Sequence, residues 1–324
     1  MKKQPSLNDW QGRNDQDDPA HAQRWHNRVV TDTGSEDAMG ILGFSCDIGV
    51  RRNHGRPGAA EGPAALRKQL ANLPWHAGDG AADQGQCTRL LDLGDVVAEG
   101  DDLESAQAEL ADSICQGLKQ VKRLLVIGGG HETAYGSFCG LYKALGAKAK
   151  IGIINLDAHF DLRKPESAGP SSGTPFYQIR ELTGSDNFHY CCLGVAQESN
   201  TDTLFNRAQQ WGVQFRTDKQ MTTADLPEIA LQLEEFSRPM DALYLTIDID
   251  VLPHYQAPGV SAPAARGVNL EVIEAVTELV ILNARRCKFG LPLADLTELN
   301  PSCDSQGVTA RTAAFIANAL LSDT

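Results

Sequence analysis

The chain has 324 residues, a hydrophobic content of 42% and a formal net charge of −13. Its length suits two average domains or one large α/β domain, and its composition is that of a globular protein with a sizeable core. The acidic balance disfavours a nucleic-acid or anionic-membrane surface, and no apolar stretch approaches the ~20 residues that span a bilayer.

The first residues, MKKQPSLNDW, lack the apolar run of a signal peptide. The 8 cysteines are irregularly spaced and form no C-x-x-C pair. A disulfide scaffold is therefore not predicted for a chain of this size. These features predict a reduced, cytoplasmic location.

Residues 1–39 are polar and aperiodic, and we interpret them as an N-terminal arm or packed loops before one domain at residues 40–324. From residue 40 on, short apolar runs alternate with longer segments of helical periodicity. The predicted strands are 40–45, 89–94, 123–129, 150–157, 188–195, 213–216, 242–250 and 288–296. The predicted helices lie near 62–72, 103–121, 132–147, 222–236, 269–286 and 307–322.

This alternation predicts an α/β fold with a mostly parallel sheet of about eight strands, covered by helices on both faces. No linker rich in Pro, Gly or Ser divides the chain, and no internal repeat is visible, which favours a single domain. Ligands of such sheets bind beyond the carboxyl ends of the strands. The charged residues of this sequence cluster at those ends.

The segment NLDAHFDLR at residues 155–163 ends an apolar run with ionisable side chains at alternate positions, namely Asp157, His159 and Asp161. In a continued strand, Asp157 and Asp161 would lie ~13 Å apart. They can meet at one point only if the strand ends here and the chain curls. A cation between them would then be needed to offset their charge.

Three strand ends together supply two imidazoles and four carboxylates. Each motif alone is weak, since strands often end in Asp and a lone His is usually a satisfied polar residue. Two carboxylates ~5 Å apart repel by roughly 3 kcal/mol at an effective dielectric constant of ~20, and only Arg163 is interleaved as a salt-bridge partner. We therefore predict two divalent cations, bound by His131, Asp157, His159, Asp161, Asp248 and Asp250.

The donor set also indicates which metal and which chemistry to expect. It is rich in oxygen and contains no thiolate, which favours Mn²⁺ over a structural zinc ion, with Fe²⁺, Co²⁺ or Ni²⁺ as substitutes. Paired divalent cations lower the pKa of a shared water enough to supply hydroxide near neutral pH. The set therefore indicates hydrolysis.

The glycine-rich segment VIGGGHETAYG offers a competing interpretation as a nucleotide-binding loop. It contains no G-K-[ST], and Thr133 occupies the third glycine position of G-x-G-x-x-G. Gly128 to Gly130 more simply permit a tight exit from the strand that directs His131 inward. The nucleotide interpretation is disfavoured.

The ordered motifs GGGHE, DAHFDLR, TIDIDVL, APGVSAP and TELNP resemble the ureohydrolase family of arginases, agmatinases and formimidoylglutamases. The likeness runs from about Gly43 to Phe315. The segments GVRRNHGRPGAAEGP, HFDLR and SGTPFYQI are most similar to formimidoylglutamases. Those enzymes hydrolyse N-formimidoyl-L-glutamate to L-glutamate and formamide in histidine degradation.

This resemblance implies a three-layer α/β/α fold and a binuclear manganese site, and it makes a homo-oligomer an expectation. By analogy with the family, Asp157 and Asp248 would bridge the two ions. One ion would be held by His131, Asp157, Asp161 and Asp248, and the other by Asp157, His159, Asp248 and Asp250.

The resemblance also implies roles near the reacting carbon. Glu298, which would otherwise be a surface or helix-capping carboxylate, would hold the cationic amidine over the nucleophile. Arginases carry a proton-shuttling histidine after the D-x-H-x-D motif, but Phe176 stands at that position here. Asp161 is therefore assigned the transfer of a proton to the leaving amine.

The substrate's carboxylates require local cations in an acidic protein, and arginine matches a carboxylate bidentately. Arg163 lies two residues beyond Asp161, and Arg56 lies in the segment NHGRPG with Asn53. Tyr177, in SGTPFYQI, is a further candidate for substrate binding. The alternative for both arginines is an ordinary solvated surface charge.

Three functions stay open beside this hydrolase. One is another ureohydrolase that acts on agmatine, guanidinobutyrate or a similar compound. Another is a non-catalytic binding protein that keeps the metal for stability, which the six ligands together with Glu298 disfavour. The last is the nucleotide-binding domain. The expected partner is a small-molecule substrate, with no nucleic acid and no membrane.

Overall fold

The computed structural model describes residues 1–14, 23–32, 38–76 and 89–322. Their strands join in one sheet of ten strands in the order β1-β4-β3-β5-β10-β9-β6-β7-β8, with β2 beside β4. The strands are β1 (Lys2–Lys3), β2 (Val29–Val30), β3 (Met39–Ser45), β4 (Leu90–Val97), β5 (Arg123–Ile127), β6 (Ile151–Leu156), β7 (His189–Val195), β8 (Gln214–Thr217), β9 (Ala242–Asp248) and β10 (Leu293–Thr297). All strand pairs are parallel except β1 with β4.

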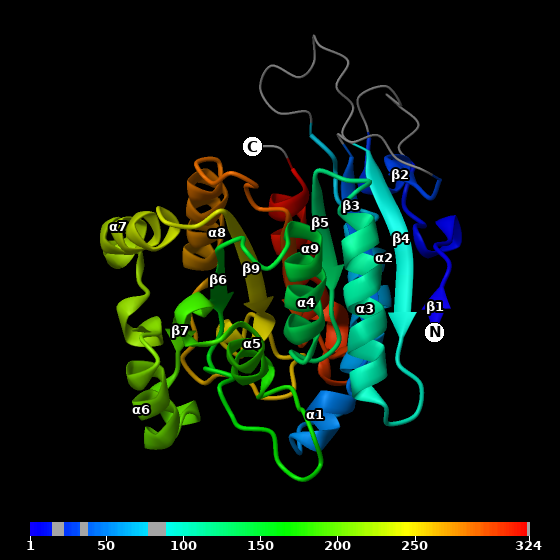
Figure 1. Ribbon diagram of the computed structural model, residues 1–324. Helices are drawn as coiled ribbons and strands as arrows, with labels where there is room; N and C mark the ends of the chain where they lie inside the picture. Colours follow the sequence, from blue (N-terminus) through cyan, green and yellow to red (C-terminus); the bar gives the residue numbers. More distant parts are fainter. Residues whose placement is uncertain (15–22, 33–37, 77–88, 323–324) are drawn as a thin grey trace.

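Helices cover both faces of this sheet and give three layers (Figure 1). The helices are α1 (Ile48–Arg52), α2 (Gly62–Leu70), α3 (Leu103–Gly117), α4 (Thr133–Leu145), α5 (Pro175–Thr183), α6 (Asp202–Gln210), α7 (Leu226–Ser237), α8 (Leu270–Ala284) and α9 (Val308–Leu321). One apolar core lies beneath α2, α7, α8 and α9, and a second lies beneath α3, α4, α5 and α6. None of the described helices is long and apolar enough to cross a membrane.

Burial on both faces explains why the strands read as continuous apolar runs. Every residue of β6, with the sequence IGIINL, is buried. The helices bury one side only, as in α4, where Phe138 and Leu141 pack on the sheet. The α/β class and the mostly parallel sheet are therefore confirmed.

The sheet has ten strands rather than the predicted eight, because β1 and β2 come from the segment that was interpreted as an arm or packed loops. Trp10 and Trp25 of that segment are buried. The described parts of residues 1–39 thus join the sheet and the core, while the division of the chain at residue 39 stays a prediction. Residues 15–22 and 33–37 of this segment lie outside the described residues.

Two further differences concern single elements. The last strand begins at Leu293 rather than near residue 288, because Pro292 has no N–H to donate to the ladder. The helix α1 has only 5 residues, little more than one turn, and so gives no periodicity from which to recognise a helix. The helices α5 and α6 were also not predicted, although α2, which was, has the same length of 9 residues.

Candidate metal centre

The predicted curl occurs where β6 ends. The strand stops at Leu156, and Asp161 adopts a left-handed backbone conformation with φ 47°. Asp157 accepts hydrogen bonds from the His159 backbone N–H at 2.6 Å and from the Asn155 amide at 2.9 Å. These features turn the side chains of Asp157 and Asp161 toward one point, which a continued strand would not allow.

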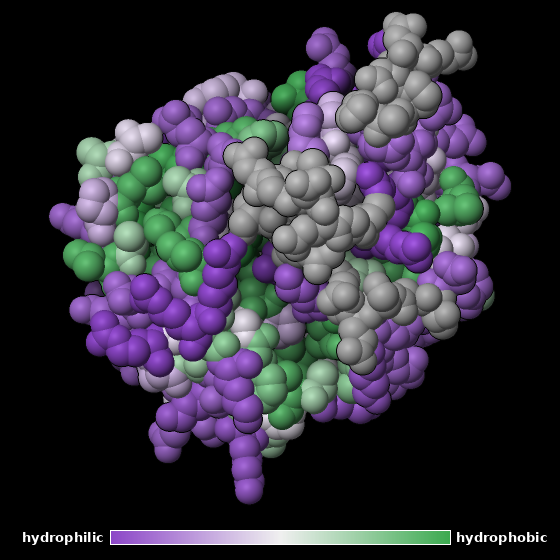
Figure 2. All heavy atoms as spheres, turned by 90° about the horizontal axis from the view of Figure 1, so that it is seen from above, coloured by the Kyte–Doolittle hydropathy of each residue, from purple (hydrophilic) through white to green (hydrophobic). Residues whose placement is uncertain are grey.

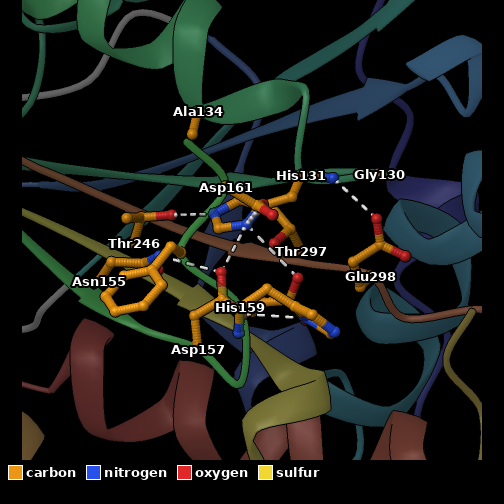
Figure 3. Close-up of polar contacts among 12 residues, drawn as sticks. Gly130, His131, Ala134, Asn155, Asp157, His159, Asp161, Thr246, Thr297 and Glu298 are labelled. Carbon is orange, nitrogen blue, oxygen red and sulfur yellow. Dashed lines mark hydrogen bonds and ion pairs between the residues drawn. The ribbon is translucent and has the colours of Figure 1, made fainter. Parts of the chain in front are cut away.

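That point is Nδ1 of His131, which follows β5. The nitrogen lies 3.1 Å from Asp157 Oδ2, 2.8 Å from Asp161 Oδ2 and 3.4 Å from Asp248 Oδ2. Figure 3 shows the side chains of His131, Asp157 and Asp161 converging from separate segments of the chain. His131 and Asp157 are completely buried or nearly so, at 1% and 0% exposure.

A second group adjoins the first and shares Asp157 with it. Nδ1 of His159 lies 3.5 Å from Asp157 Oδ1 and 3.2 Å from Asp250 Oδ2. Potential ligand atoms of His131, Asp157, Asp161 and Asp248 lie within 4.8 Å of one another, as do those of Asp157, His159 and Asp250. Asp248 belongs only to the first of these groups, so its role as a bridge between two ions stays a prediction.

The donors present fit hard divalent cations. Nδ1 of His131 and Oδ1 of Asp250 are buried without a hydrogen-bond partner among the described residues. A buried, unpaired polar atom is costly unless a partner or an ion satisfies it. Carboxylates and imidazoles that face one another suit a binuclear centre of the predicted kind.

The same crowding shifts the acid–base properties of the cluster. Burial would lower the pKa of His131, but hydrogen bonds to Asp157 and Asp161 outweigh it and raise that pKa well above its ordinary value. Burial, with the charges of Asp250 and Asp157, raises the pKa of Asp248 well above its ordinary value. The cluster therefore favours added positive charge, whether protons or metal cations.

Glu298 is held beside this cluster immediately after β10. Its Oε1 accepts a hydrogen bond from the His131 backbone N–H at 2.9 Å, and its Oε2 accepts one from the Ser261 hydroxyl at 2.8 Å. The side chain is only 3% exposed and adopts φ 64°. Burial, followed by the charges of Glu132 and Asp250, raises the pKa of Glu298 to about 8.

A cleft with about 130 Å³ of water-accessible space opens above the cluster. It is lined by polar and charged side chains more than by apolar ones. The lining residues are Asn53, His131, His159, Asp161, Arg163, Ser172, Ser199, Asn200, Leu204, Asp248, Asp250, Ser261, Ala262 and Glu298. Five of the six predicted ligands thus face this space, whereas Asp157 is completely buried and outside its lining.

The predicted substrate-binding residues are distributed unevenly around the cleft. Asn53 and Arg163 line it and both pack on Gly173, where an added Cβ would lie 3.4 Å from the Asn53 amide and 3.1 Å from Arg163 Cδ. Arg56 instead donates hydrogen bonds to the carbonyls of Val260 and Ser261 and lies outside the lining.

Tyr177 also lies outside the lining and packs against Trp211, with ring centroids 5.4 Å apart. Direct substrate contact by any of these four candidates stays a prediction.

Two positions next to the cluster were not assigned from the sequence. Ser261 lies in the motif APGVSAP, but no pattern of residues distinguished its hydroxyl as the partner of Glu298. Glu132, next to His131, accepts a hydrogen bond from the Gly49 backbone N–H at 2.8 Å and so fixes α1, which precedes Asn53. A contact between residues so far apart in sequence leaves no local signal.

Phe176, which the family resemblance places where arginases are expected to have a proton-shuttling histidine, packs beside the cluster. Its ring is completely buried, with its centroid 5.5 Å from that of His131 in an edge-to-face arrangement. Phenylalanine has no proton to transfer. Any proton transfer in the cleft must therefore use other groups.

Comparison with known sequences gives matches over nearly the whole chain. The family model described as the Arginase family matches residues 37–322. A formimidoylglutamase of Aeromonas hydrophila is 46% identical over 318 residues, which are 96% of each chain. A formimidoylglutamase of Ralstonia nicotianae is 45% identical over 314 residues, which cover 94% of this chain and 92% of that protein.

Comparison with solved structures gives the same fold. A formimidoylglutamase of Bacillus subtilis superposes with a TM-score of 0.80 at 21% identity, over 93% of this chain and 92% of that one. A formiminoglutamase of Trypanosoma cruzi, solved with Mn²⁺, superposes with a TM-score of 0.78 at 24% identity, over 93% and 97% of the two chains. The expected arginase-like fold is thereby confirmed.

The backbone of Glu298 yields a testable prediction. A residue with a Cβ at φ 64° is strained, whereas glycine adopts this conformation freely. We expect the free energy of unfolding of Glu298→Gly to exceed that of Glu298→Ala by about 1 kcal/mol. Urea denaturation of the metal-free proteins measures it. Both variants lose the buried carboxylate, so the difference between them reports the effect of the backbone conformation on stability.

Gln306 supplies the control, because it has φ 74° and lies on a 3-10 turn outside the cleft lining. Gln306→Gly and Gln306→Ala should differ in the same direction and by a similar amount. If Glu298→Gly is no more stable than Glu298→Ala while the Gln306 pair differs, the strain at Glu298 is refuted.

Proposed function

The chain belongs to the arginase family, and from this membership we propose that it hydrolyses N-formimidoyl-L-glutamate to L-glutamate and formamide. The observation that carries the proposal is the 46% identity to a formimidoylglutamase over 96% of both chains. The reaction is a step of histidine degradation. It cleaves a C–N bond of a linear amidine, whose cationic head suits an acidic cleft.

We propose that two Mn²⁺ ions occupy the centre. His131, Asp157, Asp161 and Asp248 would hold one, and Asp157, His159, Asp248 and Asp250 the other. The oxygen-rich donor set and the Mn²⁺ of the Trypanosoma cruzi formiminoglutamase support this choice. Two such cations lower the pKa of a shared water and so supply a nucleophile near neutral pH.

Glu298 positions the substrate in this mechanism. Its carboxylate is fixed by the His131 backbone N–H and the Ser261 hydroxyl, so it need not reorganise when the substrate enters. A buried carboxylate attracts the cationic amidinium and fixes the reacting carbon over the centre. This attraction also selects an amidine over a neutral amide.

In the proposed mechanism, Asp161 transfers the proton of the attacking water. It lines the cleft, and its neighbour Phe176 cannot transfer a proton. We assign to its carboxylate the proton that the attacking water releases, which it then returns to the leaving nitrogen. The leaving group departs as the amine of glutamate.

We further propose that the protein acts in the cytoplasm on a small molecule and forms a homo-oligomer. Its acidic net charge of −13 supports the absence of nucleic-acid and membrane partners. The oligomer is proposed from the family resemblance alone.

A substrate panel tests the function. Purified protein loaded with Mn²⁺ should release glutamate and formamide from N-formimidoyl-L-glutamate with a kcat/KM well above that for arginine, agmatine or guanidinobutyrate. Faster release of urea from one of the guanidino compounds would identify a different ureohydrolase. A metal-loaded protein that turns over none of these compounds would instead support the non-catalytic alternative.

Removing the charge of Glu298 tests its positioning role. Glu298→Gln should keep both metal ions, because Glu298 is outside the proposed ligand set, but should lose most of its turnover. Metal content by atomic spectroscopy and kcat/KM on N-formimidoyl-L-glutamate are the measurements. Glu278→Gln, at an exposed position of α8, is the control. Near-normal kcat/KM in Glu298→Gln would exclude Glu298 from the mechanism.

Arg163 should bind a substrate carboxylate. Among the described residues its guanidinium has no ion pair, and it faces the cleft beside Asn53. Loss of a charge-assisted hydrogen bond costs roughly 1.5–3 kcal/mol, so Arg163→Met should lower kcat/KM by about tenfold to a hundredfold. The penalty should be much smaller on an amidine analogue without carboxylates.

Arg56→Met is the matched comparison, since Arg56 donates hydrogen bonds to the carbonyls of Val260 and Ser261. A larger penalty on N-formimidoyl-L-glutamate than on the analogue would support the predicted contact of Arg56 with a substrate carboxylate, and equal penalties would make its role structural. Equal penalties for Arg163→Met on the two substrates would make Arg163 structural as well.

A further inference from the structure

The His131 imidazole makes a second contact on the edge opposite the carboxylates. Its Nε2 lies 2.9 Å from Oγ1 of Thr246, a residue of β9 (Figure 3). Both side chains are buried, with 1% and 0% exposure. The proposed mechanism uses neither this nitrogen nor Thr246.

The surroundings of Thr246 are completely buried. Asp295 of β10 lies directly opposite Thr246 in the ladder of parallel strands, and both Asp295 and Tyr244 are 0% exposed. Asp295 accepts a hydrogen bond from the Tyr244 hydroxyl, while its Oδ1 has no hydrogen-bond partner among the described residues. The side-chain hydrogen bond of Thr246 is the one to His131.

The position of the cluster sets the direction of the hydrogen bond between His131 and Thr246. Nδ1 of His131 faces the carboxylates of Asp157 and Asp161, where a bound cation would use its lone pair. The proton of the neutral imidazole is then on Nε2, and the Thr246 oxygen is its acceptor.

We propose that the buried hydroxyl of Thr246 fixes the tautomer and orientation of His131 for metal binding. Thr246 is a positioning residue, because it lies outside the cleft lining and the proposed ligand set and contacts His131 alone among the ligands. Groups that hold the second nitrogen of a metal-binding histidine typically change metal affinity by about tenfold to a hundredfold when removed. The inference rests on the metal centre of the proposed function but not on its substrate.

Substitution of Thr246 separates the hydrogen bond from packing. Thr246→Val keeps the shape and removes the acceptor, whereas Thr246→Ser keeps the hydroxyl and removes a methyl group. Apo-protein is titrated with Mn²⁺, and the electron paramagnetic resonance signal of free Mn²⁺ gives the two dissociation constants. Thr246→Val should weaken one of the two ions by about tenfold to a hundredfold, while Thr246→Ser stays close to wild type.

Thr277→Val is the matched control. Thr277 is buried on α8, and its hydroxyl donates to the Ile273 carbonyl at 2.8 Å. This variant should bind both ions as the wild type does.

The outcomes distinguish the Thr246 hydrogen bond from the metal centre itself. If wild type takes up no Mn²⁺, the proposed metal centre is wrong and the inference falls with it. If wild type binds two ions and Thr246→Val binds them equally well, only the role of the Thr246 hydrogen bond is refuted. A packing role predicts the opposite order, with Thr246→Ser weaker than Thr246→Val, and that order would also overturn the proposal.

Discussion

Four aspartate carboxylates converge at one end of the sheet, and the surrounding structure depends on how their charge is held. Among the described residues that line the cleft, Arg163 is the only lysine or arginine, and it lies exposed at the rim. The backbone N–H groups of His159 and Asp250 donate to Asp157 and Asp248, but they carry no full charge. The remaining compensation must come from protons on the imidazoles or carboxylates, or from bound cations. The fold thus creates a site that divalent cations would stabilise.

The site achieves this convergence at a cost in backbone conformation. Asp161 and Glu298 adopt positive φ angles, which cost non-glycine residues roughly 1–2 kcal/mol each. Both follow strands buried in the centre of the sheet, where ladder hydrogen bonds and two apolar cores hold the chain in place. Strain at a functional site persists only where such surroundings over-determine it. The geometry of the site therefore depends on the rigidity of the sheet that holds these two residues.

The sequence allowed prediction of whatever depends on local pattern. Apolar runs identified the eight longer strands, and the alternate ionisable residues of NLDAHFDLR required the curl that Asp161 makes. Contacts between distant segments were not predictable: the bonds from Ser261 to Glu298 and from Gly49 to Glu132 join residues that carry no shared motif. The strands β1 and β2 were missed because two-residue strands have no periodicity. The metal roles of the six candidate ligands stay a prediction, although their side chains lie together.

The place of β10 in the sheet has a consequence for biosynthesis. Its residues, Leu293–Thr297, are the last strand of the described chain, yet they lie between β5 and β9. Of the candidate ligands, His131 follows β5, and the other five lie at the ends of β6 and β9, which pair directly with each other on the far side of β10. A nascent chain therefore contains all six candidate ligands before it contains the strand that separates β5 from β9. The five can come together without β10, but His131 takes its place beside them only once β10 has been synthesised and inserted.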